Sequence, residues 1–190
     1  MSDNEIAEKL RKLLLDVGAY NKEKHYVEFD RVWYEPKTLN YCADLICEYI
    51  RTIQDQFPKE TSNIILLSSD DLRSDFGIIP VSSVVANKLD YRFAVWKEMA
   101  DIKWGTSSIM GNTTPGLFCI VLQDVVSRGH TSIRIAQSMK TLDWKFAFYI
   151  TVVLNNKHDG YSVDTTMDKI SPILGTRPNF RYIVSASDLE

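Results

Sequence analysis

The sequence predicts an α/β domain in which a central, mostly parallel sheet is flanked by helices. Two observations lead to this prediction. Short apolar runs, typical of buried strands, alternate along the chain with segments whose apolar residues recur at helical spacing. The chain has 190 residues and no internal repeat, low-complexity segment or linker, which suits a single domain with a real core. Because parallel strands end along one edge of a sheet, we expect ligands to bind at that edge.

The N-terminal part of the chain carries two helix signals. Ser2 and Glu5 have the spacing of a capping box, and Gly18 is placed to end the helix that follows. Pro36 suits the first turn of a second helix, and the polar and aromatic segment 21–37 could contain a short strand. The apolar stripes of the two helices are Ile6, Leu10, Leu13, Leu14 and Val17, then Leu39, Ala43, Ile46, Ile50 and Ile53.

The middle of the chain reads as strand, helix and strand. A short apolar strand is expected over 64–67, and it leads into serines and acids. Pro80 opens a third helix, and the alternating segment 91–97 predicts another strand. The mostly polar segment 98–116 is long enough to form a mobile loop or a hairpin, and such segments are often functional.

The last third predicts a strand over 117–122, a loop, and a helix that begins at about Thr131. A long apolar strand is expected over 145–155, and the segment 177–190 could add one more. Together with the earlier elements this makes a sheet whose strands are connected by helices, as the fold prediction requires.

Composition and charge narrow the function classes. The net charge of −3 lacks the basic excess of a nucleic-acid-binding surface, no apolar run could span a bilayer, and the first residues lack the apolar core of a secretion signal. Cys42, Cys47 and Cys119 fit buried apolar positions in a reducing compartment, and no Cys/His spacing resembles a zinc site. We therefore expect a cytoplasmic protein without a nucleic-acid or membrane partner.

The segment 116–140 contains the residues that are best suited to bind a ligand. A strand that feeds a helix through a short loop directs unpaired N–H groups and the helix dipole outward together, which favours an anion. Asp124 is suited to accept hydrogen bonds from vicinal hydroxyls, and Gly129 allows close approach of the backbone to a ligand. Further donors come from Ser127, Arg128, Thr131 and Ser132. This combination describes a ribose 5-phosphate site; the alternative is an ordinary strand-to-helix turn. Neither a Walker loop nor a G-x-G-x-x-G motif is present.

The stretch "CIVLQDVVSRGHT", residues 119–131, resembles the phosphoribosyl-pyrophosphate-binding signature of the type I phosphoribosyltransferases. That signature has four mostly apolar residues, two acids, two apolar residues and a small polar loop with a glycine. Further stretches resemble the orotate phosphoribosyltransferases: "KLLLDVGAY" their N-terminal helix, "EPKTLNYCADLICEYI" the helix after their base-binding segment, "GIIPVSSVVANKLDYRFAVWKE" a helix and strand, and "IKWGTSSIMG" their mobile catalytic loop.

The resemblance implies a type I phosphoribosyltransferase-like fold with a small N-terminal hood over residues 1–35 and a core over 36–190. It implies transfer of ribose 5-phosphate from phosphoribosyl pyrophosphate to a nitrogenous base, with Mg²⁺, in a homodimer; no metal ligand is assigned. The implied catalytic residues are Lys103 and Asp124. Gln123 and Asp124 would hold the ribose, and Ser69, Asp70 and Lys97 the pyrophosphate. The 5-phosphate loop would consist of Ser127, Arg128, Gly129, His130, Thr131 and Ser132.

Four departures from the family pattern keep a second hypothesis open. Gln123 replaces an acid, Trp96 replaces a cation, the segment 68–77 is acidic where a pyrophosphate loop is small and glycine-rich, and the base-binding segment is short. Three carboxylates in the acidic segment would repel pyrophosphate unless a metal intervenes. The leading hypothesis is a transferase of the orotate type. The alternative is a weakened or inactive protein of the same fold that binds a nucleoside monophosphate or sugar phosphate in a regulatory or partner-binding role.

Overall fold

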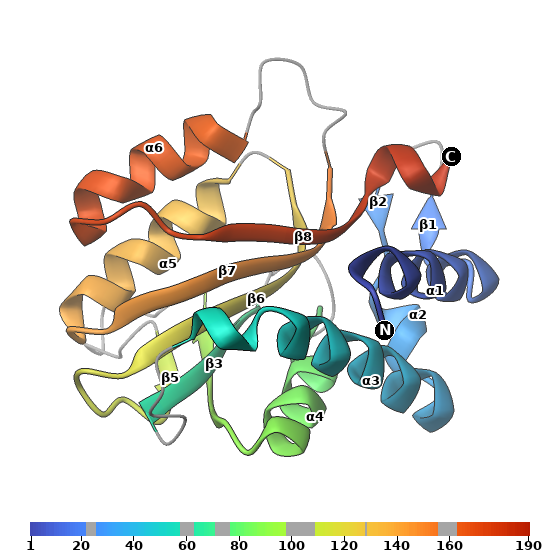
Figure 1. Ribbon diagram of the computed structural model, residues 1–190, viewed down its shortest axis with the longest axis horizontal. Coiled ribbons are helices and arrows are strands. Elements are labelled where there is room, and N and C mark those ends of the chain that lie inside the picture. Colours follow the sequence, from blue (N-terminus) through green and yellow to red (C-terminus); the bar gives the residue numbers. More distant parts are fainter. Residues whose placement is uncertain (22–25, 58–62, 71–76, 98–108, 128, 156–162) are drawn as a thin grey trace.

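The computed structural model describes residues 1–21, 26–57, 63–70, 77–97, 109–127, 129–155 and 163–190 (Figure 1). Its centre is a six-stranded sheet in the order β5-β4-β3-β6-β7-β8. All neighbours pair in parallel except β4 and β5, which are antiparallel. The strands are β3 (Ile64–Asp70), β4 (Arg92–Lys97), β5 (Ile109–Gly111), β6 (Phe118–Val126), β7 (Lys145–Leu154) and β8 (Phe180–Ser185). The predicted α/β fold with a mostly parallel central sheet is confirmed.

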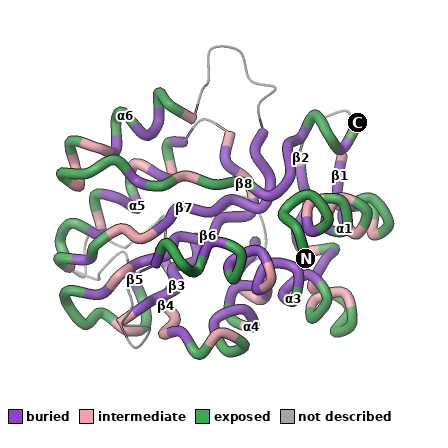
Figure 2. Tube along the Cα trace, in the orientation of Figure 1, coloured by how far each residue is buried: buried purple, intermediate pink, exposed green. Residues whose placement is uncertain are grey.

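Helices cover both faces of this sheet (Figure 1). The first face packs against α1 (Asp3–Asp16), α3 (Pro36–Thr52) and α4 (Ile79–Leu89). The second face packs against α5 (His130–Thr141), and α6 (Val163–Leu174) packs against α5. Since both faces are covered, the central strands β3, β6 and β7 lie largely in the interior, as their buried stretches in Figure 2 show, while the edge strands β5 and β8 are partly exposed.

The apolar run of β3 shows how the sequence builds this layered core. Ile64 and Leu66 belong to the cluster formed with α1, α3 and α4, while Ile65 and Leu67 belong to the cluster formed with α5. All four side chains are fully buried. Successive side chains of a strand point to opposite faces, so a continuous apolar run is what a strand covered on both sides requires.

Local signals at the helix ends are confirmed. The Ser2 side chain accepts a hydrogen bond from the Glu5 N–H, and the Glu5 carboxylate accepts one from the Ser2 N–H at 2.8 Å, which completes the capping box of α1. Pro36 is the first residue of α3. Gly18 follows the end of α1 with a φ of +66°, a left-handed conformation that glycine adopts without strain.

Several elements were not predicted, or were predicted with other bounds. The polar segment after α1 contains the two-stranded hairpin of β1 (Tyr20–Asn21) and β2 (Tyr26–Val27), followed by the short helix α2 (Asp30–Trp33). Helix α6 was missed, although its buried Met167 and Ile170 continue a helical stripe that begins at Val163. Short 3-10 turns follow α3 (η1, Gln54–Gln56) and β8 (η4, Ala186–Leu189).

The strand that leads to the predicted phosphate loop is longer than expected. β6 extends to Val126 rather than ending at Leu122, because Val125 and Val126 pair with Val153 and Leu154 of β7. Gln123 therefore lies inside the sheet, in register with Thr151, and not on a loop. This difference decides what the Gln123 side chain contacts.

The sequence also predicted that the cysteines are buried and that no segment could span a bilayer. Cys42, Cys47 and Cys119 are free and buried, as predicted, and burial raises the pKa of Cys42 to about 12 and that of Cys47 to about 11. Within the described part of the chain, none of the helices has both the length and the apolarity that crossing a bilayer would demand.

Candidate functional site

The connection from β6 to α5 joins the carboxyl end of a central strand to a helix N-terminus. The Val126 carbonyl accepts a hydrogen bond from the Asn155 N–H at 2.9 Å, which fixes the end of β6 against the end of β7. Gly129 is the N-cap of α5, and its carbonyl accepts the first helical hydrogen bond, from Ile133, at 3.1 Å. The N–H groups of the first helical turn have no partner within a helix, so this end of α5 has the donors and the dipole that an anion needs.

Gly129 has a conformation and a location that only glycine satisfies. Its φ is +69°, in the left-handed region, where a side chain is strained. A Cβ atom at this position would lie 2.3 Å from the Thr166 Oγ1 and 2.5 Å from the Thr166 Cγ2. Thr166, a buried residue of α6, therefore packs directly against Gly129 and restricts the loop. The sequence predicted glycine here for close approach to a ligand; the close approach that the structure describes is to α6.

Asp124 lies next to this loop, within β6. Its side chain is buried, with 9% of the residue exposed, and its Oδ1 accepts a hydrogen bond from the Val125 N–H at 2.7 Å. The Asp124 carbonyl accepts a hydrogen bond from the Thr151 Oγ1 at 3.3 Å. These two contacts fix the residue in the strand, three positions before Ser127, and they leave the predicted ribose contact as a prediction.

Gln123 is the centre of a buried chain of hydrogen bonds between neutral side chains. Its Nε2 donates to the Ser69 Oγ at 3.0 Å, and its Oε1 accepts from the Ser132 Oγ at 3.2 Å. The Ser132 Oγ in turn accepts from the Tyr149 hydroxyl at 2.7 Å. None of these four residues is more than 4% exposed. The chain connects the end of β3, the middle of β6, the first turn of α5 and β7.

This network changes the interpretation of two predicted site residues. Ser132 was expected to donate its hydroxyl to a phosphate, but its one hydroxyl hydrogen is donated to Gln123 inside the core. Gln123 was expected to bind the ribose, but both ends of its amide bind Ser69 and Ser132. The Ser132 hydroxyl lies in the core, and its contact with a phosphate stays a prediction. For Gln123 the ribose contact stays a prediction.

Sequence reasoning missed Tyr149, Ser138 and Thr166. Tyr149 lies in the apolar run of β7, and a tyrosine in a strand buried on both faces needs a hydrogen-bond partner, which is the signal that could have found it. Ser138 accepts a hydrogen bond from the Trp96 Nε1 at 3.0 Å, so Trp96, the residue that replaces a cation, is held inside the molecule against α5. It is only 2% exposed.

The structure describes some of the other predicted site residues and leaves the rest undescribed. Lys97 is the exposed last residue of β4, and its main chain pairs with that of Asp70. Ser127 and Thr131 are half-buried around the loop, and His130 is exposed at the start of α5. Lys103, Arg128, Asp71 and Asp75 lie outside the described residues, as does the Asp70 side chain.

The resemblance stated from the sequence implies a magnesium ion, whose fit depends on oxygen ligands. Gln123 is a poor candidate ligand, because its amide oxygen accepts a hydrogen bond from Ser132 and the residue is only 4% exposed. The Asp124 carboxylate has the right chemistry. In the part of the chain that the structure describes, no group of three or more His, Cys, Asp or Glu side chains could hold a metal ion. No protein metal site is therefore assigned.

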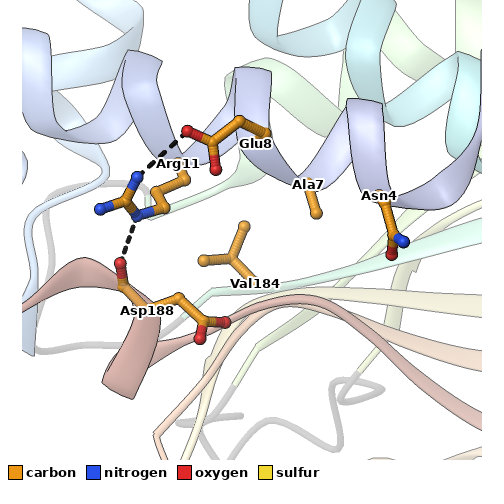
Figure 3. Close-up of a pocket in the computed structure, with 6 residues that line it drawn as sticks. All are labelled: Asn4, Ala7, Glu8, Arg11, Val184 and Asp188. Carbon is orange, nitrogen blue, oxygen red and sulfur yellow. Dashed lines mark hydrogen bonds and ion pairs between the residues drawn. The ribbon is translucent and has the colours of Figure 1, made fainter.

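A hollow lies between the first helix and the C-terminal elements of the described chain (Figure 3). It has a volume of about 220 Å³ and lies between α1, β8 and η4. The Arg11 guanidinium donates to the main-chain oxygen of Asp188 and binds Glu8 at 3.1 Å, so its charge is used to attach the C-terminal turn to α1. The lining residues are Asn4, Ala7, Glu8, Arg11, Val184 and Asp188. Because Arg11 already binds Asp188 and Glu8, we interpret it as a residue that stabilises the fold and do not assign it to a ligand site.

Comparison with known proteins shows where this architecture recurs. No protein-family model and no curated protein match the sequence. Among solved structures, orotate phosphoribosyltransferase from Aeropyrum pernix is 12% identical with a TM-score of 0.68, and the match covers 95% of each chain. Orotate phosphoribosyltransferase from Mycobacterium tuberculosis, solved in complex with phosphoribosyl pyrophosphate, is 15% identical with a TM-score of 0.60, covering 99% of this chain and 91% of that one.

The UMP synthase of Leishmania donovani is 15% identical with a TM-score of 0.66. That match covers 95% of this chain and 36% of the synthase, so this chain spans about a third of the synthase's length. Identities this low establish the architecture of the chain and leave its activity open. The sheet order, the covering helices and these similarities together show that the chain has the fold of the type I phosphoribosyltransferases, which the orotate enzymes share.

Proposed function

We propose that this chain binds a 5-phosphorylated ribose at the β6–α5 connection and transfers ribose 5-phosphate from phosphoribosyl pyrophosphate to a nitrogenous base. One observation carries the proposal: on this fold, Asp124 is followed by a loop in which a left-handed Gly129 begins α5. The complex of the M. tuberculosis enzyme with phosphoribosyl pyrophosphate supports this substrate.

The proposed roles follow from the chemistry of the groups. The main-chain N–H groups from Gly129 to Ser132 would bind the 5-phosphate, together with Ser127, Arg128 and Thr131. Asp124 would accept hydrogen bonds from the ribose hydroxyls. Lys97 and Lys103 would neutralise the charge that develops on pyrophosphate. Because the transition state is dissociative, positioning and electrostatic stabilisation would supply most of the catalysis.

A second candidate function is favoured by the network around Gln123. A glutamine adds no charge that could stabilise a positive ribose-like transition state, and this one is bonded to Ser69 and Ser132 inside the core. Trp96 likewise brings no cation to the pyrophosphate side. These observations favour a protein that retains the sugar-phosphate pocket and uses it to bind a nucleoside monophosphate in a regulatory or partner-binding role.

One experiment separates the two candidates. Phosphoribosyl pyrophosphate and nucleoside monophosphates are titrated by calorimetry with and without magnesium, and pyrophosphate release is assayed with a panel of bases that begins with orotate. Release that Asp124→Ala abolishes, and that Asp55→Ala in the exposed turn η1 leaves intact, supports the transferase. Monophosphate binding without release supports the binding protein. Absence of binding by every phosphate ligand refutes both.

Three finer points belong to the same proposal. Magnesium accompanies the transferase reaction, with the Asp124 carboxylate as the candidate protein ligand, and the titrations without magnesium test this. The chain forms a homodimer, which sedimentation measures directly. The protein acts in the cytoplasm, which fractionation of the source cells checks.

A further inference from the structure

The hydrogen-bonded chain Ser69–Gln123–Ser132–Tyr149 connects the two sides of the proposed site. Ser69 lies near the end of β3, the strand that leads to the predicted pyrophosphate segment. Ser132 lies in the first turn of α5, where the 5-phosphate is proposed to bind. Between the two, the only link through side chains that these contacts describe is the amide of Gln123.

The amide is matched to both of its partners. A glutamine offers a donor at one end and an acceptor at the other, and here the donor binds Ser69 while the acceptor binds Ser132. An ionised acid at this position could accept from both serines but could donate to neither, and it would bring a charge into a site that is 4% exposed. Neutral hydrogen bonds inside the core need no counter-charge, so the network can fix α5 without one.

We propose that Gln123 is a positioning residue: through Ser132 it fixes the first turn of α5 relative to the end of β3, and so sets the geometry of the phosphate-binding N–H groups without contacting the ligand. This inference rests on the proposed phosphate site. Its consequence is specific, because a residue that acts through the helix turn affects every ligand that the turn binds. A residue that contacts the ribose affects only ligands that contain a ribose.

The test compares two probes, inorganic phosphate and ribose 5-phosphate, by NMR titration of the full chain. Gln123→Leu removes both hydrogen bonds of the amide, and Ser132→Ala removes the hydroxyl but keeps the main-chain N–H. We expect each variant to weaken binding of both probes about tenfold, since the turn loses a buried hydrogen bond. The double variant should be little weaker than either single one, because both act on the same contact. Ser138→Ala, also on α5 but outside the network, should bind both probes like the unchanged protein.

The other possible outcomes contradict either this inference or the proposed function. If Gln123→Leu weakens ribose 5-phosphate alone, Gln123 contacts the ribose and the inference is wrong. If neither probe weakens in folded variants, the network serves only stability and the inference is again wrong. If the unchanged protein binds neither probe, the proposed function fails and the inference fails with it. Should Gln123→Leu not fold, the unbranched and uncharged Gln123→Met and Ser132→Ala carry the same comparison, and loss confined to ribose 5-phosphate in either one overturns the inference.

Discussion

The carboxyl ends of β6 and of the pair β3–β4 lie on the same fold, but they use their polar side chains differently. At the end of β6, Asp124 is followed by a loop that leads to the N-terminus of α5. At the ends of β3 and β4, Ser69 and Trp96 point inward and bind Gln123 and Ser138 at 3.0 Å each.

The difference concerns two chemical tasks, binding a phosphate and stabilising a developing charge. A phosphate-binding loop needs a glycine, a helix N-terminus and main-chain donors, and these are retained here. Stabilising a developing charge needs charged side chains nearby, but Gln123 in β6 and Trp96 in β4 are neutral groups bonded to α5. The following variants test this contrast, from the largest expected effect to the smallest.

Gly129→Ala should damage the β6–α5 connection most. We expect the free energy of unfolding to fall by about 3 kcal/mol, because the new Cβ is strained by the left-handed φ and meets Thr166 as well. Urea unfolding measures this loss. Gly175→Ala is the matched control, since Gly175 has a φ of +75° and nothing within 4 Å of an added Cβ; it should cost only about 1 kcal/mol. Equal losses for the two variants would show that Thr166 does not fix the loop.

Gln123→Asp should destabilise the protein by about 3 kcal/mol at pH 7, since a charge replaces an amide in the buried network. Burial raises the folded-state pKa of the introduced carboxyl above its unfolded value, so the loss is largest above the folded pKa and shrinks below about pH 4. Unfolding at both pH values measures the difference. Gln123→Asn, equally short but neutral, should show no such pH dependence. A variant that keeps its stability and gains magnesium-dependent binding would mean that Gln123 faces the ribose.

Trp96→Phe tests the β4 side of the comparison. It removes the donor to Ser138, and a double-mutant cycle with Ser138→Ala should give a coupling energy of about 1 kcal/mol. Binding of ribose 5-phosphate should not change, since Trp96 is held away from the phosphate loop by α5. A coupling energy near zero would indicate that this hydrogen bond does not stabilise the β4 end.

Asp143→Gly should have the smallest effect, and a favourable one. Asp143 lies between α5 and β7 with a φ of +55°, so glycine relieves the strain and should add about 0.5 kcal/mol to the free energy of unfolding. Thermal melts measure both variants: Asp143→Gly should raise the midpoint of unfolding and Asp143→Ala should lower it. Because this turn belongs to neither strand end, phosphate binding should be the same in both variants.

Much of the fold could be predicted because its signals are local. The capping box of Ser2 and Glu5, the proline that opens α3, and the apolar runs of the strands each act within a few residues of sequence. A short strand was expected somewhere in segment 21–37, but its position and its pairing with β1 were not predicted, because two-residue strands carry no periodicity. Helix α6 was missed although its stripe was visible.

The residues of the candidate site also fall into two groups: those whose place the sequence predicted and those whose contacts it did not. The glycine and the acid of the β6–α5 segment follow from a recognisable stretch of sequence. The roles of Gln123 and Ser132 do not, because they depend on Ser69 and Tyr149, which are brought close only by the pairing of β6 with β3 and β7. A sequence pattern locates a residue on a strand but does not identify its hydrogen-bond partners on other strands.

The central claim is that the β6–α5 connection binds the phosphate of a 5-phosphorylated ribose. The most direct measurement is a titration of the isotope-labelled protein with ribose 5-phosphate, following the main-chain N–H signals. We expect saturable shifts concentrated between Ser127 and Ser132, and weaker binding in Gly129→Ala. Shifts confined to other parts of the chain, or no saturable shift at all, would contradict the claim.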